Sequence, residues 1–274
     1  MKVRHFFQYN CRVNTNAPYD PQYFAPLFRA EESHFWFISR NRIVADVLEG
    51  LDDQLPAGYR ALELGCGNGN TLRVTEAACR RGKVTGSDLF QSGLRLAKLR
   101  VNCPLVQADV KDLPFGRIFN LVSFFDVLEH IRDDRGMLES VKEMLLPGGY
   151  LVITVPAEPA LWSYFDVASH HERRYTTESL SRLLEGSGYD VVRLTAFMSL
   201  TYPLVWLRRK LMRNESLLEL GKDSNTHALQ ELQVAGVLNW ILFQLLKLER
   251  ARLKRGGSYK KGSSLLAVAR PKVS

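Results

Sequence analysis

The chain has 274 residues, of which 46% are hydrophobic and 24% are charged, and this globular composition excludes disordered and collagen-like chains. Four irregularly spaced cysteines fit reduced intracellular thiols better than a disulfide scaffold. The net charge is +8. Residues 193–274 contain 15 Lys and Arg but only 5 Asp and Glu, whereas residues 1–192 contain 22 Lys and Arg and 24 Asp and Glu, so the whole basic excess lies after residue 192.

Short apolar runs alternate with amphipathic stretches along most of the chain. Residues 1–30 predict an irregular arm that ends in a short helix, and residues 31–50 predict a helix that stops at Gly50. From residue 51 onward the alternation is typical of a parallel sheet with helices on both faces. We expect strands at 60–64, 83–88, 105–108, 119–125, 150–155, 190–195 and 264–269, and helices at 71–81, 93–100, 135–146 and 177–185.

A glycine-rich loop joins the first strand of this pattern to the helix after it. Its sequence is ALELGCGNGN at 61–70, with Glu63 in the strand and glycines at 65, 67 and 69. Gly65 permits a tight turn, and Gly67 lets the backbone approach a ligand because no Cβ intervenes. A dinucleotide site needs GxGxxG, and position 70 is Asn, so that match fails. A plain glycine turn is the alternative interpretation.

Two aspartates follow at the ends of the next two strands. Asp88 lies about 20 residues after the glycines, where a carboxylate can accept both hydroxyl hydrogens of a ribose. Asp109 follows the third strand, where it can accept from an adenine amino group. Each aspartate alone is more often a cap or turn residue, but open α/β sheets bind ligands at these strand ends. Together with Glu63 and the glycines, they favour an adenosine-containing ligand.

These segments resemble the motifs of the class I S-adenosylmethionine-dependent methyltransferases. ELGCGNG at 63–69 looks like the first motif of that family, SDL at 87–89 like its ribose-binding segment, and ADVKDLPF at 108–115 like its adenine-contacting segment. FFDVLEHI at 124–131 and LLPGGYLVITVP at 145–156 look like the fourth-strand and fifth-strand motifs. VLEHI and LLPGG are similar to the branch that contains the ubiquinone-type O-methyltransferases and other small-molecule enzymes.

The resemblance implies a fold, a cofactor and a set of binding residues. The fold is α/β, a Rossmann-like, mostly parallel seven-stranded sheet with helices on both faces and a reversed last strand, which a helical insertion precedes. The cofactor is S-adenosylmethionine, and no metal is expected, since no cluster of His and Cys has metal-ligand spacing. The cofactor-binding candidates are Glu63, Gly65, Cys66, Gly67, Asp88, Leu89, Asp109, Val110 and Asp126, with Trp36 and Arg40 from the N-terminal helix.

The chain accordingly divides into four parts. We expect an N-terminal arm with lid helices at 1–50, a cofactor-binding core at 51–197, a helical insertion at 198–256, and a last strand at 257–274 that completes the core sheet. Four bulky residues in a row, FWFI at 35–38, suit either core packing or an aromatic lid over the cofactor. In similar methyltransferases the N-terminal helices form such a lid, which would put Arg40 or Arg42 near the cofactor carboxylate.

Methyl transfer needs alignment and exclusion of water, because the sulfonium already activates the methyl group. A hydroxyl acceptor also needs a base. The catalytic candidates are His130, after the fourth strand, and the pair His170 and His171, in a loop that should overhang the site. A packed or capped histidine is the alternative at each position. Further along the same loop, TTES predicts a helix cap at Thr176 or Thr177.

The insertion combines basic residues with apolar stretches too short to cross a bilayer, as in LVWLRRKLMR at 204–213 and LLKLERARLKR at 245–255. This pattern suits an amphipathic helix on an anionic membrane surface better than a nucleic-acid groove, and no nucleic-acid partner is expected. Packing on the sheet or a homodimer seam are the alternatives. We therefore expect a cytoplasmic protein, peripheral to the inner face of the membrane, with a small-molecule or lipid-linked acceptor.

Other classes of function fit less well. A nicotinamide-dependent Rossmann oxidoreductase is disfavoured by the GxGxG spacing and by the motifs that follow it. A noncatalytic membrane-associated scaffold would have no need of Gly65, Gly67, Asp88 and Asp109. A nucleic-acid methyltransferase is disfavoured because FDVLEH occupies the place where base-methylating enzymes carry Asn/Asp-Pro-Pro-Tyr.

Overall fold

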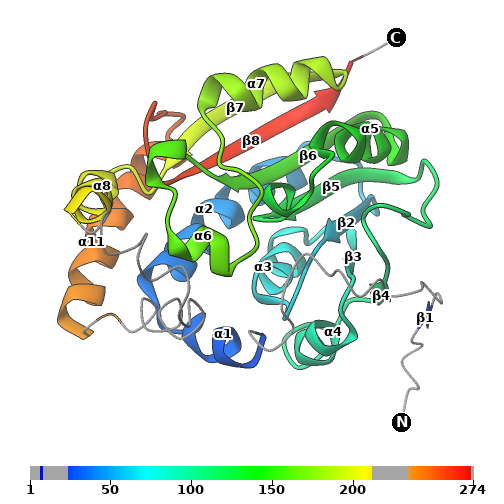
Figure 1. Cartoon of the computed structure of the whole chain (residues 1–274). Coiled ribbons are helices and arrows are strands. Elements are labelled where there is room, and N and C mark those ends of the chain that lie inside the picture. The colour runs from blue at the N-terminus through cyan, green and yellow to red at the C-terminus, as the bar shows by residue number, and fades with distance from the viewer. Residues whose placement is uncertain (1–6, 9–23, 212–233, 235, 273–274) are drawn as a thin grey trace.

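In the computed structural model, residues 7–8, 24–211, 234 and 236–272 are described. Eight strands form one sheet in the order β1-β4-β3-β2-β5-β6-β8-β7 (Figure 1). The strands are β1 (Phe7–Gln8), β2 (Arg60–Leu64), β3 (Lys83–Asp88), β4 (Leu105–Gln107), β5 (Phe119–Phe125), β6 (Leu145–Pro156), β7 (Tyr189–Phe197) and β8 (Ser264–Pro271).

The sheet has the predicted seven strands, and one short strand in addition. Neighbours from β1 to β6 pair in parallel, whereas β8 runs antiparallel to both β6 and β7. Strands β2 to β8 therefore confirm the mostly parallel sheet with a reversed last strand. The two-residue strand β1 adds an edge to it, in a segment for which we predicted an irregular arm.

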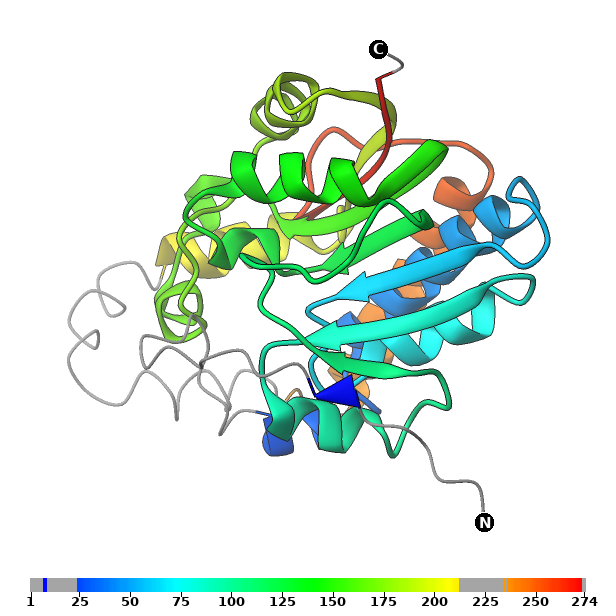
Figure 2. The same ribbon diagram turned by 90° about the vertical axis from the view of Figure 1, so that its right-hand side faces the viewer.

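Helices cover both faces of the sheet (Figures 1 and 2). They are α1 (Phe24–Ala30), α2 (Phe35–Asp52), α3 (Asn70–Ala78), α4 (Gln91–Ala97), α5 (Asp134–Met144), α6 (Tyr164–Ala168), α7 (Thr177–Gly186), α8 (Tyr202–Leu211) and α11 (Gly236–Lys254), with 3-10 turns η2 (Leu128–His130) and η3 (Pro159–Leu161). Among the described residues, no helix has the length and apolar character needed to cross a membrane.

Two hydrophobic clusters form the core, one on each face of the sheet. The first includes residues of α2, α3, α4 and α11, and the second includes residues of α5 and α7. Within β6, Val152 belongs to the first cluster and Ile153 to the second, because successive side chains of a strand point to opposite faces. The near-continuous apolar strands of the sequence are thus buried on both sides.

Some predicted boundaries need correction. Helix α2 continues past Gly50 to Asp52, since later hydrogen bonds extend its last turn. The helix expected at 135–146 ends at Met144, and the PGG segment at 147–149 lies inside β6 and not between that helix and the strand expected at 150–155. The pairing register shifts there, from Phe119 with Leu145 to Leu121 with Tyr150, so the strand accommodates the extra residues as an irregularity.

Two other predictions concern the ends of the core. The capping sequence is confirmed with Thr176 as the cap of α7, since its side chain accepts from the backbone N–H of Ser179. The insertion expected at 198–256 is described only in part, as α8 and α11, and residues 212–233 and 235 lie outside the described residues. The first part of the arm lies outside them as well.

We predict that Gly69→Ala destabilises the fold more than Gly58→Ala. Both glycines have left-handed backbone, with φ of +82° and +78°, which costs a residue with a Cβ about 1–2 kcal/mol. At Gly69 the added Cβ would also lie 2.8 Å from the Cα of Ala97, whereas nothing lies within 4 Å at Gly58. Urea unfolding should give losses of about 2–5 kcal/mol at Gly69 and about 1–2 kcal/mol at Gly58. Equal losses would contradict the close packing of the glycine loop against α4.

Candidate functional site

A cavity of about 300 Å³ opens at the carboxyl ends of the central parallel strands. Gly65, Asp88, Asp109 and Asp126, which follow β2, β3, β4 and β5, all line it. The strand order reverses at β2, whose two neighbours are β3 and β5. Loops leave a crevice at such a reversal, and open α/β sheets bind their ligands there.

The glycine loop and Asp88 form one hydrogen-bonded unit. Asp88 accepts from the backbone N–H of Gly67 at 2.7 Å through Oδ2, and from that of Phe90 at 2.8 Å through Oδ1. Gly65 and Gly67 have φ of +64° and +52°, a conformation in which residues with a Cβ are strained. Burial raises the pKa of Asp88 to about 6, although the two backbone hydrogen bonds oppose this shift. The carboxylate is therefore held in place before any ligand arrives.

Most of the predicted cofactor residues line this cavity. Besides the strand-end residues, the wall includes Cys66, Gly67, Leu89, Val110 and Arg40. Glu63 and Trp36 are not among the lining residues. The sequence pattern placed Glu63 in the site because it precedes the glycines, but its side chain points under the loop.

Glu63 connects β2 to α3. Its carboxylate accepts from the hydroxyl of Thr71 at 2.8 Å and from that of Thr75. Burial raises the pKa of Glu63 to about 7, although the two hydrogen bonds from the hydroxyl groups oppose this shift. Its contact with the helix that follows the glycine loop makes it a positioning residue for that loop.

Helix α2 places Arg40 at the cavity. The guanidinium Nη1 donates to Oδ2 of Asp126 at 2.6 Å, and Thr154 donates to the other oxygen of Asp126 at 3.2 Å. Arg40 also lies 4.9 Å from the ring centroid of Trp36, so Trp36 supports the arginine from outside the cavity. Arg42 is directed away from the site, because its guanidinium lies over the ring of Phe243 on α11.

The sequence pattern did not identify the side chains that line the cavity from α1 and the residue after it. Phe24 and Leu27 line the cavity from α1, and Glu31 directly follows that helix. Phe37, one of the four bulky residues considered as an aromatic lid, lines it from α2. Arg100 holds α1 in place, since it donates to Glu31 at 2.6 Å and to the backbone carbonyl of Phe28 at 2.7 Å. The available signal was the aromatic segment of the arm, whose weak periodicity gave no contact partner.

Of the three candidate histidines, only His130 lines the cavity. It lies at the end of η2, and its ring centroid is 4.8 Å from that of His171. Burial, followed by the neighbouring His171, lowers the pKa of His130 to about 3, so the ring is neutral at ordinary pH. His170 is exposed, has φ of +56°, and is not among the residues that line the cavity.

A buried polar cluster supports His130 from behind. His171 Nδ1 lies 2.9 Å from Asp166, which also accepts from Arg174 at 2.7 Å. Burial opposes ionisation of Asp166, but the hydrogen bond from His171 and the charge of Arg174 hold its pKa below the ordinary value. Asp166 therefore fixes the orientation of the His171 ring, and Arg174 has a structural partner.

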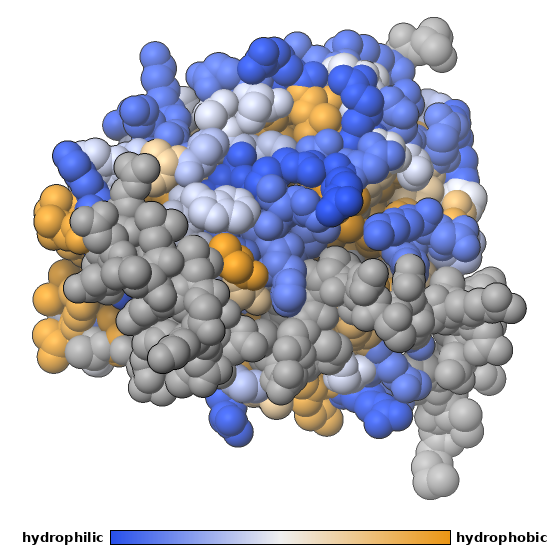
Figure 3. Space-filling model, viewed as in Figure 1, coloured by the Kyte–Doolittle hydropathy of each residue, from blue (hydrophilic) through white to orange (hydrophobic). Residues whose placement is uncertain are grey.

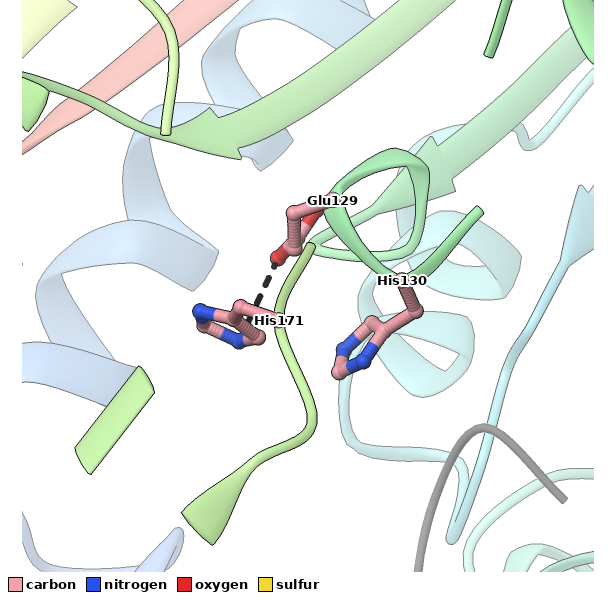
Figure 4. A group of neighbouring side chains, drawn as sticks. All are labelled: Glu129, His130 and His171. Carbon is pink, nitrogen blue, oxygen red and sulfur yellow. Dashed lines mark ion pairs between the residues drawn. The ribbon is translucent and has the colours of Figure 1, made fainter. Parts of the chain in front are cut away.

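Glu129 completes this cluster (Figure 4). Its carboxylate lies 4.0 Å from Nε2 of His171, and neither of its oxygens has a hydrogen-bond partner in the part of the chain that the structure describes. Burial raises the pKa of Glu129 well above its ordinary value, and the charge of Asp126 adds to this. Ligand atoms of Glu129, His130 and His171 lie within 4.8 Å of one another, a donor set that suits a divalent cation.

Comparison with known families gives a match over most of this region. A family model described as a methyltransferase domain matches residues 35–194, which is more than half of the chain. The match begins at α2 and ends within β7, so it includes the glycine loop, the strand-end aspartates and the histidine cluster.

Individual relatives are identical to this chain at less than a third of the aligned positions, which cover only part of its length. The chain is 31% identical over 110 residues to a demethylmenaquinone methyltransferase of Staphylococcus epidermidis, over 38% of this chain and 46% of that protein. It is 27% identical over 191 residues to a ubiquinone biosynthesis O-methyltransferase of Dinoroseobacter shibae, over 62% of this chain and 75% of that protein. The chain thus spans less than half the length of the first of these relatives.

A solved structure shares the fold. A chain of the Haloferax volcanii complex that contains the Trm112 methyltransferase activator aligns with a TM-score of 0.57 and 16% identity. The alignment covers 92% of this chain and 96% of that one, so it includes the regions on either side of the family match. At this identity the likeness shows the arrangement of strands and helices alone.

The raised pKa of Asp88 predicts a pH dependence of stability. Because its pKa is about 6 in the folded chain and 3.8 as the ordinary value, the folded state binds more protons between these two pH values. This contribution to stability is complete below about pH 3.8 and is lost as the pH rises through about 6. Denaturant unfolding should show that the free energy of unfolding of wild type, relative to that of Asp88→Asn, falls by up to about 3 kcal/mol over this pH range. Parallel trends would contradict it.

Proposed function

Since the chain belongs to the methyltransferase domain family, we propose that it moves a methyl group from S-adenosylmethionine to a hydroxyl of a small, lipophilic acceptor. The observation that carries the proposal is the hydrogen bond from the Gly67 backbone to Asp88 at the cavity wall. It places a fixed carboxylate beside backbone that carries no Cβ, as an adenosine ligand requires.

The cavity has the donors and acceptors that this cofactor needs. Each oxygen of Asp88 accepts one backbone N–H and keeps a lone pair for a ribose hydroxyl. Asp109, held by a hydrogen bond from the backbone of Lys111, can accept from the adenine amino group. Arg40 and Asp126 present a positive and a negative group side by side, and we assign them to the carboxylate and ammonium of the methionine part. When bound, the cofactor supplies a methyl group on a positively charged sulfur.

His130 is the base in this proposal. It lies on the cavity wall, where a ring nitrogen can accept the proton of an acceptor hydroxyl, and burial keeps the imidazole neutral at ordinary pH. His171 and Asp166 hold it from behind as positioning residues. The exposed His170 has no part in it. The lid formed by α1 and α2 excludes water from the transfer.

The alternatives identified from the sequence lack comparable support. A nicotinamide oxidoreductase would hold a pyrophosphate at the start of α3, where Asn70 instead accepts a hydrogen bond from Asn41. A noncatalytic scaffold gives no reason for the fixed Asp88 and the lined cavity. The proposal also includes a cytoplasmic location and peripheral contact with a membrane, and a homodimer is its alternative.

Cofactor binding is tested at the glycine loop. A Cβ at Gly67 would meet the Phe24 ring at 3.3 Å, and φ of +52° strains any residue with a Cβ, so circular dichroism first establishes that Gly67→Val folds, and its side chain would then lie in the cavity. Asp88→Ala removes charge-assisted hydrogen bonds of about 1.5–3 kcal/mol. Calorimetry with S-adenosylhomocysteine should show most affinity lost in the first variant and a roughly ten- to hundredfold loss in the second. Wild-type affinity in both would contradict the cofactor assignment.

The acceptor is found by incubating the protein with methyl-labelled S-adenosylmethionine and extracts of lipids or small molecules. Mass spectrometry should detect a labelled product with wild type, and none with Gly67→Val, which is the control for uncatalysed transfer. Alkaline hydrolysis cleaves a methyl ester but leaves an O-methyl ether or a methylamine intact, and fragment masses then distinguish these two. Absence of any labelled product across both kinds of extract would count against enzymatic transfer.

Once the acceptor is known, His130→Gln tests the base. Removing a general base costs about 10²–10⁴-fold in rate, while affinity for S-adenosylhomocysteine should stay within about twofold. Because its pKa is lowered to about 3, the wild-type rate should show no loss from His130 protonation between about pH 5 and 8. A His130→Gln enzyme with the wild-type rate would exclude this role.

A further inference from the structure

Helix α8 exposes an apolar stripe. Leu204, Leu207 and Leu211 follow one another at spacings of three and four residues, so they share one side of the helix. All three are exposed, and Leu211 is 74% exposed. No residue of α8 is buried. A surface helix normally turns such a stripe toward the core, so the packing of the described residues does not account for it.

Helix α11 has two apolar sides, of which only one meets the protein. Its buried residues Leu242, Leu246 and Leu253 recur at helical spacing and belong to the side that meets the fold. The opposite side carries Val237, Trp240, Ile241 and Leu248, with Trp240 exposed to 61% and Val237 to 75%. Isolated exposed hydrophobic residues are ordinary, but a second stripe along the same helix is not.

Specific contacts fix both helices to the fold. Arg250 on α11 forms a paired contact with Asp46 on α2, at 2.6 and 2.9 Å. The buried carboxylate of Glu249 accepts from the backbone N–H groups of Ser199 and Leu200, just before α8 begins. Since α11 holds the start of α8, the two exposed stripes keep a defined relation to the core.

The stripes lie on one side of the molecule. Figure 1 places α8 and α11 together at its left-hand edge, and Figure 3 shows hydrophobic side chains at the same edge. We define the docking face as the exposed stripes of these two helices, which comprise Leu204, Leu207 and Leu211 with Val237, Trp240, Ile241 and Leu248.

Positive charge borders this docking face. Arg208, Arg209 and Lys210 follow one another within α8, and the Nζ of Lys210 lies 5.1 Å from the ring centroid of Trp206, which is 39% exposed. No Asp or Glu occurs in α8. Tryptophan beside basic residues, next to an apolar stripe, is the arrangement of side chains found at a membrane interface.

We propose that the docking face binds the surface of an anionic phospholipid bilayer. The apolar stripes would lie among the acyl chains near the headgroups, and the basic residues of α8 would contact the anionic headgroups. This inference rests on the proposed function and extends it, because a bilayer is the partner that would present a lipophilic acceptor to the cavity. Charge decides between occupants, since a second copy would bring the same positive residues to the contact, whereas an anionic bilayer brings the opposite charge.

Vesicle flotation with the full chain tests the proposal. One set of vesicles is phosphatidylcholine, and the other is an equal mixture of phosphatidylcholine and phosphatidylglycerol. The protein should float with the mixed vesicles at low salt, and the binding should weaken as salt is added. Arg208→Gln/Lys210→Gln should reduce the partition coefficient by about thirtyfold, at about 1 kcal/mol for each basic residue. Leu211→Ser/Trp240→Ser should reduce it at least tenfold.

Matched controls use residues of similar exposure away from the docking face. Leu99→Ser/Val192→Ser replaces apolar residues that are 75% and 57% exposed, and Arg117→Gln/Arg132→Gln replaces two exposed arginines. Both controls should float like wild type. Calorimetry with S-adenosylhomocysteine is run on every variant, because loss of cofactor binding in wild type would contradict the proposed function and leave the flotation result standing.

Three results would overturn the proposal. The wild-type protein could stay out of the mixed vesicles at low salt. The docking-face variants could float like the controls. Sedimentation could show a dimer that Leu211→Ser/Trp240→Ser converts to a monomer, without flotation of wild type, which would assign the docking face to a second copy of the chain.

Discussion

The hydrogen bonds that Asp88 accepts from the backbone of Gly67 and Phe90 hold the centre of this molecule together. They join the loop after β2 to the end of β3, at the point where the strand order reverses. The loop can approach the aspartate because Gly65 and Gly67 adopt left-handed backbone. Burial raises the pKa of the carboxyl group, so keeping it charged in the cavity opposes folding at neutral pH. In the proposed function, hydroxyl donors of a ribose would offset this cost.

Buried ion pairs attach the N-terminal helices to this centre. Arg100 joins α1 to the glycine loop through Glu31 and Asn68, and Arg40 joins α2 to the loop after β5 through Asp126. Breaking such a pair leaves a buried charge without its partner, which is strongly destabilising. Helices α1 and α2 are therefore coupled electrostatically to residues that line the cavity.

The C-terminal third of the chain serves two surfaces at once. One side of α11 completes the core over α2, and its other side, with α8, presents apolar residues outward. Two carboxylates fix this arrangement. Asp46 on α2 binds Arg250 on α11, and Glu249 on α11 accepts from the backbone N–H of Ser199. Three of the basic residues after residue 192, namely Arg208, Arg209 and Lys210, lie in α8 together with its exposed stripe.

The sequence by itself determined the sheet, the glycine loop and the strand-end aspartates, because these depend on local pattern: apolar runs, glycines at a turn, and acids at fixed distances after them. It also predicted a cap at Thr176 or Thr177, and the structure has it at Thr176. Only the tertiary structure decided which side chains meet across long separations. It placed the Glu63 carboxylate against Thr71 and Thr75 of α3, brought Phe24 to the cavity wall, and set His171 beside His130 and Glu129. Such contacts follow from how whole helices pack, and a single sequence carries no local signal for that.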